Sequence, residues 1–132
     1  MRRTLTAAAL STALLLAGAP LATSAVAKGG NDDRIIRTGS CSGSSDWKLK
    51  AKSDDGRLEV EWEVDSNRSG QTWRVRVRDN GALVVKTRGT TVGASGSFSV
   101  ERLIGNRAGG DSIVARSRDL SSGQVCVGRL TF

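Results

Sequence analysis

Apolar and charged residues alternate along three consecutive segments of the chain, residues 46–52, 57–65 and 72–79. The apolar positions are Trp47, Leu49, Ala51, Leu58, Val60, Trp62, Val64, Trp73, Val75 and Val77. The charged positions between them are Lys48, Lys50, Lys52, Glu59, Glu61, Glu63, Arg74, Arg76 and Arg78. A period of two, with one apolar and one charged face, predicts half-buried β-strands.

Four further segments have the composition of short strands, at residues 82–88, 96–102, 111–118 and 124–131. Gly or Asn marks most connections, as in Asn80-Gly81. No stretch after the N-terminal region has a convincing helical period. Seven short strands with regular turn signals predict an all-β fold, a seven-stranded antiparallel β-sandwich of the immunoglobulin or fibronectin kind.

Two architectures differ in the neighbours that they give the arginine-bearing segment 72–79. The tight connection before residue 57 places the three lysines beside the three glutamates, so those two strands neutralise each other. In a simple meander, the arginines would also face the glutamates. In an immunoglobulin-like sandwich, segment 72–79 lies in the opposite sheet beside segment 111–118, and its arginines are joined by Arg116 and Arg118.

The distribution of charge favours the two-sheet arrangement. The whole chain carries a net charge of +7, and residues 80–132 hold 7 basic and 3 acidic side chains. A three-residue turn with Gly81 left-handed would point Leu83 and Val85 inward and Lys86 and Arg88 outward. The hypothesis is a polyanion-binding sheet face made of Arg74, Arg76, Arg78, Lys86, Arg88, Arg116 and Arg118. The competing interpretation is a solvated face whose arginine stems cover apolar surface.

The first 27 residues have the pattern of an export signal. Arg2 and Arg3 precede a largely apolar stretch over residues 5–22, and Ala25-Val26-Ala27 offers small residues for cleavage after residue 27. Because Gly18 and Pro20 interrupt the apolar stretch, we expect no membrane insertion. The expected organisation is a signal peptide at 1–27, a flexible lead-in at 28–45 and the β-sandwich domain at 46–132.

The two cysteines, Cys41 and Cys126, both lie after the leader. An exported chain meets oxidising conditions, so we expect them to form one disulfide. The chain-entropy model gives a loop of this length a stabilisation of roughly 4 to 5 kcal/mol. That is a large share of the stability of so small a domain.

Several catalytic chemistries are excluded by composition. After residue 27 the chain has no His, Tyr or Met, so a Ser-His-Asp triad, a Cys-His pair and a histidine metal site cannot be built. We therefore expect no enzymatic activity, no metal and no cofactor.

The three tryptophans fall on the apolar side of their strands and are assigned to the core.

The leader and the Gly-, Ser-, Arg- and Val-rich remainder resemble small secreted proteins of high-GC Gram-positive bacteria. The run AGGDSIVA at residues 108–115 and the later GQVC at 123–126 resemble the last two strands of immunoglobulin-like domains. The chain departs from that pattern by lacking the corner tyrosine and by placing its cysteines on the first and last segments. The resemblance implies a secreted setting and carries over no catalytic residue.

The expected function is that of a secreted, non-enzymatic binding module. Its basic sheet would engage anionic polymers such as cell-wall polyphosphates or acidic polysaccharides. Nucleic acid would bind only non-specifically, because no aromatic residue is interleaved with the arginines. The alternative is an inhibitor or protein-binding domain that acts through a loop at residues 89–96 or 105–110.

Overall fold

The computed structural model describes residues 33–132, and the predicted signal peptide at 1–27 lies outside this range. Within it the protein consists of strands and connections, without helix. The strands are β1 (Arg34–Ser40), β2 (Asp46–Asp54), β3 (Arg57–Asp65), β4 (Thr72–Asp79), β5 (Ala82–Thr90), β6 (Ser97–Gly105), β7 (Ser112–Asp119) and β8 (Val125–Thr131).

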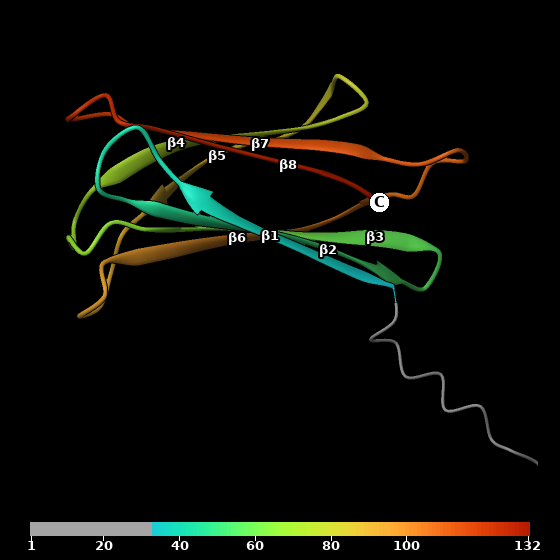
Figure 1. Cartoon of the computed structure of the whole chain (residues 1–132), viewed down its shortest axis with the longest axis horizontal. Helices are drawn as coiled ribbons and strands as arrows, with labels where there is room; N and C mark the ends of the chain where they lie inside the picture. Colours follow the sequence, from blue (N-terminus) through green and yellow to red (C-terminus); the bar gives the residue numbers. More distant parts are fainter. Residues whose placement is uncertain (1–32) are drawn as a thin grey trace, which may run out of the picture.

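The strands form two antiparallel four-stranded sheets. One has the order β1-β2-β3-β6 and the other β5-β4-β7-β8, and Figure 1 shows them as two stacked layers. β4 pairs with β7 and not with β3, which rules out the meander and confirms the two-sheet arrangement. Between the layers lies one core, to which both sheets contribute the apolar half of their alternation.

The predicted number of seven strands is wrong, because β1 is an eighth. It lies in the segment predicted to be a flexible lead-in, and residues 28–32 of that segment fall outside the described range. β1 forms a full ladder with β2, from Arg34 opposite Lys52 to Ser40 opposite Asp46. Only Ile35 packs against the core, so the strand is held mainly by backbone hydrogen bonds and leaves little hydrophobic pattern in the sequence.

Two tight turns determine which side chains of the long hairpins point towards the core. Asp55 and Gly56 both have positive φ, and so do Asn80 and Gly81, the pattern of a two-residue type I′ turn. The predicted three-residue turn at Asn80-Gly81 is therefore wrong. Instead, β5 has one additional residue within a β-bulge. Val77 pairs with Val85, but the next position of β4 pairs with Leu83. Consequently Leu83 points outward and is 44% exposed, against prediction.

Two of the three tryptophans lie in the buried core, as predicted, and the third, Trp47, is partly buried and packs against it. Trp62 and Trp73 are fully buried, and Trp47 stacks on Trp62 with ring centroids 5.5 Å apart. Gly128 on β8 makes room for this stack, since a Cβ there would come within 2.7 Å of both rings. A small residue on β8 is thus required by the close approach of the two sheets.

The predicted disulfide between Cys41 and Cys126 is present. Cys126 is buried on β8, whereas Cys41 follows β1, so the bond links the two sheets across the core edge. Next to it, Ser42 N–H donates to the Val125 carbonyl at 2.8 Å, and Val125 N–H donates to Ser42 Oγ at 2.9 Å. The end of β1 is therefore fastened to the opposite sheet.

Candidate functional site

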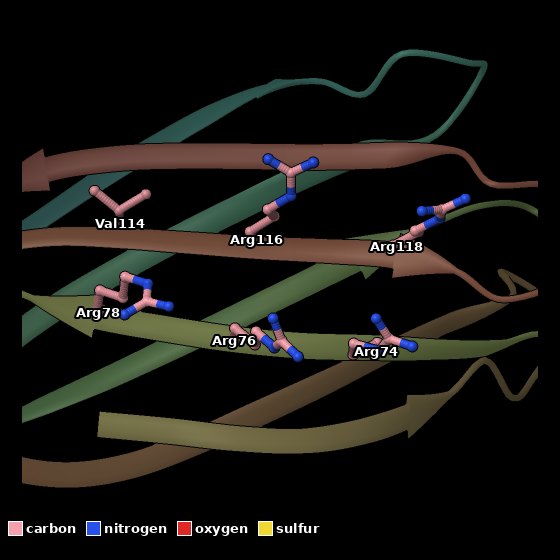
Figure 2. A pocket seen from close by; sticks show the side chains of 6 residues that line it. All are labelled: Arg74, Arg76, Arg78, Val114, Arg116 and Arg118. Carbon is pink, nitrogen blue, oxygen red and sulfur yellow. The ribbon is translucent and has the colours of Figure 1, made fainter. Parts of the chain in front are cut away.

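The outward side of the β5-β4-β7-β8 sheet carries a dense group of cationic side chains, which we call the basic face. Its members are Arg74, Arg76 and Arg78 on β4, Lys86 and Arg88 on β5, Arg116 and Arg118 on β7, and Arg129 on β8. Figure 2 shows the five arginines of β4 and β7 projecting from these two adjacent strands on the same side. The seven residues predicted from the sequence thus lie on one surface.

Cations on the basic face lie directly opposite one another across the ladders. Arg74 lies between Arg88 and Arg118, and Arg76 lies between Lys86 and Arg116. Neighbouring strands are about 4.8 Å apart, and like charges at such positions destabilise a sheet. No outward position of these four strands is occupied by an acidic residue.

The opposite sheet also has like-charged residues directly opposite each other, Arg34 with Lys52 and Glu61 with Glu101, but the lysines of β2 have carboxylate partners on β3. Lys50 Nζ lies 2.6 Å from Glu61 Oε2, and the flanking pairs Lys48–Glu63 and Lys52–Glu59 are each 3.4 Å apart. The hydrogen bond from Lys50 lowers the pKa of Glu61, against the raising effect of burial. By contrast, no cation of the basic face forms a salt bridge within residues 33–132.

Arg76 occupies the centre of the basic face. It is half-buried, and its Nε is buried without a hydrogen-bond partner among the described residues. It lines a groove of about 450 Å³ between β4 and β7 together with Arg74, Arg78, Val114, Arg116 and Arg118. An oxyanion placed in this groove would meet several guanidinium groups and supply the acceptor that Arg76 Nε lacks.

Sequence reasoning missed Arg129 at the edge of the basic face. Arg129 pairs with Val114, and Val114 pairs with Arg78. The alternation of side chains along β8 could have predicted the position of Arg129. Because Cys126 is buried, Val125, Val127 and Arg129 lie on the opposite, outward side of the strand. These valines give the face an apolar flank.

A buried carboxyl pair lies at the end of β4. Asp79 is 1% exposed and Asp111 is fully buried, while the partly exposed Arg107 brings its Nε within 3.5 Å of Asp79 Oδ2. Burial, reinforced by the hydrogen bond and the charge of Asp111, raises the pKa of Asp79. Asp111 accepts the backbone N–H of Arg107 at 3.2 Å. The pair closes a loop and is not part of the basic face.

Of the two loops predicted as alternative binding elements, the one at residues 105–110 carries Arg107, which contacts the buried carboxyl pair, whereas the one at 89–96 contains no charged residue. In the loop between β5 and β6, Val92 is 64% exposed and forms an isolated bridge with Ser97.

Among residues 33–132 there is no group of three or more potential metal ligands. In the same range, no helix has the length and apolar character needed to cross a membrane.

No protein-family model, no curated protein and no solved structure matches this chain.

Proposed function

We propose that this protein is an exported, immunoglobulin-like binding module that engages anionic polymers through the basic face. The immunoglobulin-like part of the proposal is supported by strand order. β2, β3 and β6 take the places of strands A, B and E, and β5, β4, β7 and β8 take those of C′, C, F and G. Trp73, buried on β4, has the position of the core tryptophan on strand C.

Export is proposed from the leader at residues 1–27 and from the disulfide. Disulfides form and persist in oxidising compartments such as the extracellular space. The resemblance to small secreted proteins of high-GC Gram-positive bacteria belongs to the same proposal.

The observation that carries the binding proposal is the set of directly opposed cations. Four like-charged pairs, Arg74–Arg88, Arg74–Arg118, Arg76–Lys86 and Arg76–Arg116, cost about 0.2 to 1 kcal/mol each without an anion. A face that only has to remain soluble does not need this arrangement, and the other sheet pairs its lysines with glutamates. A polyanion would convert the repulsion into attraction and release counterions.

The test is retention of the protein on immobilised heparin, a sulfated polysaccharide, across a salt series. A variant with Arg74, Arg76 and Arg78 changed to Ser should bind more weakly, and its slope of log affinity against log salt should be lower by about 2 to 3. The matched control changes Lys48, Lys50 and Lys52 to Ser on the opposite sheet, which removes the same charge. Circular dichroism would confirm that both variants fold.

If both variants lose affinity equally, net charge alone governs retention and the proposal fails. Weak retention of the unmodified protein on heparin, together with a lack of binding to other polyanions, would also contradict it. Salt-resistant binding to a defined protein would instead favour the alternative, an inhibitor or partner-binding domain, for which the exposed Val92 offers an apolar contact.

A further inference from the structure

The basic face has a regular repeat along the strand direction, and this repeat restricts the polymer that fits it. The inference about the polymer rests on the proposed function, the binding of polyanions by the basic face. On β4, Arg74, Arg76 and Arg78 recur every second residue, a spacing of about 6.7 Å. On β7, Arg116 and Arg118 repeat the spacing in register with Arg76 and Arg74.

These two columns of arginine form the walls of the groove between β4 and β7 (Figure 2). Two of the rows across the groove carry an arginine on each side, Arg74 with Arg118 and Arg76 with Arg116. The third row has Arg78 on one side and the apolar Val114 on the other. The groove therefore offers two doubly cationic positions and one singly cationic position at equal intervals.

The repeat matches a polymer with the same number of backbone bonds between charges. Two residues of a strand contain six backbone bonds and extend over about 6.7 Å. A phosphodiester chain in which a three-carbon alcohol joins successive phosphates also has six bonds from one phosphorus atom to the next. Condensed polyphosphate has only two, so its charges fall at less than half the interval of the arginines.

The absence of stacking partners favours a polyol over a nucleic acid. A single-stranded nucleic acid also has six backbone bonds per phosphate, but its bases need flat partners to stack on. The outward positions of β4, β5, β7 and β8 carry no aromatic side chain. The face instead offers aliphatic contacts, from Leu83, Val114, Val125 and Val127, beside the cations.

We infer that the groove between β4 and β7 binds an extended poly(polyol phosphate) chain parallel to the strands, one phosphate lying over each row of arginines. The central phosphate lies between Arg76 and Arg116 and accepts the otherwise unpartnered N–H of Arg76 Nε. Arg76 is thus the residue that fixes the register of the polymer on the sheet. A lysine there would keep the charge but lose the Nε–H donor.

The first experiment is competition for labelled heparin, monitored by fluorescence anisotropy. The competitors are poly(glycerol phosphate), condensed polyphosphate and oligothymidylate, with equal numbers of phosphates per chain. Poly(glycerol phosphate) should displace heparin at about tenfold lower concentration than condensed polyphosphate, because it places more phosphates in hydrogen-bonding positions. Simple charge density would give the opposite order.

The second experiment compares Arg76→Lys with Arg102→Lys, a matched change at an exposed arginine of β6, in the opposite sheet and outside the basic face. We expect Arg76→Lys to weaken binding of poly(glycerol phosphate) about tenfold and Arg102→Lys to change it less than about twofold. Binding of condensed polyphosphate should respond little to either change, because both keep the charge. Equal effects of the two changes would overturn the assignment of Arg76.

The outcomes separate this inference from the proposed function. If condensed polyphosphate is the strongest competitor, binding follows charge density, and the inference fails while polyanion binding stands. If oligothymidylate equals or exceeds poly(glycerol phosphate), the assignment to a polyol polymer is overturned in favour of nucleic acid. If the protein does not bind labelled heparin and none of the three polymers binds when tested directly, both the inference and the proposed function fail.

Discussion

Arg76 on β4 and Arg116 on β7 lie directly opposite each other across the ladder that joins their strands, in the middle of the basic face. Each is also two residues away from another arginine on its own strand, Arg74 and Arg118. No anionic side chain among residues 33–132 pairs with any of the four. The packing of the core beneath the sheet therefore compensates for the repulsion between these arginines.

Removing one of the opposed cations should stabilise the protein when no polyanion is present. We expect Arg116→Thr to raise the free energy of unfolding by about 0.2 to 1 kcal/mol at low salt, with a smaller gain at high salt because of screening. Urea denaturation at two ionic strengths measures this. Arg129→Thr is the control, since Arg129 lies opposite Val114 and not opposite a cation. A loss of stability in Arg116→Thr would contradict the prediction.

Gly128 should tolerate no side chain. In Gly128→Ala, the added Cβ would meet Trp62 at 2.6 Å and Trp47 at 2.7 Å, and we expect a cost of about 1 to 3 kcal/mol. Gly105→Ala is a matched control at the end of β6, because nothing lies within 4 Å of the position that its Cβ would take and its φ is not left-handed. Thermal unfolding of the two variants should differ clearly, and equal melting temperatures would show that the stacked rings can shift.

The stability of the protein should carry a pH-dependent contribution from Asp79. Its pKa is raised in the folded state, so the folded protein binds this proton more tightly than the unfolded chain does. The contribution is unfavourable at neutral pH and is relieved as pH falls through the raised pKa towards the ordinary value of 3.8. Asp79→Asn should accordingly exceed the unmodified protein in stability at neutral pH, by a margin that shrinks on acidification.

This margin must be measured as a difference, because two other carboxyl groups act in the opposite direction. Burial raises the pKa of Asp119, but hydrogen bonds from Ser122 and Ser121 outweigh it and lower the pKa overall. The pKa of Glu61 is also lowered, and both groups contribute stability that is lost as pH falls through their folded-state values. Urea denaturation of both proteins from neutral pH to about pH 4 isolates Asp79. A margin that grows on acidification would refute the assignment.

Loss of the disulfide should cost much of the stability. Changing Cys41 and Cys126 to Ser releases a constraint between residues 85 apart, for which the chain-entropy model gives roughly 4 to 5 kcal/mol. Because the bond fastens the end of β1 to β8, hydrogen exchange in the double variant should accelerate first in β1. Uniform acceleration in all strands would show that β1 does not open independently.

The alternation of side chains was sufficient to predict β2, β3 and β4 and their buried faces. Trp62 and Trp73 are in the core, and Lys50 meets Glu61, because facing follows from the local geometry of an extended chain and from a short turn. The disulfide was likewise predictable, since the chain has only two cysteines.

The neighbours of β4 and of β1 were decided only by the tertiary structure. The pattern of β4 is the same whether it lies beside β3, where Glu61 would neutralise Arg76, or beside β7, where Arg116 opposes it. Packing of two sheets around one core selects β7, and this non-local choice creates the basic face. β1 escaped prediction for the same reason: its ladder to β2 and its disulfide stabilise it, and neither appears in its local sequence.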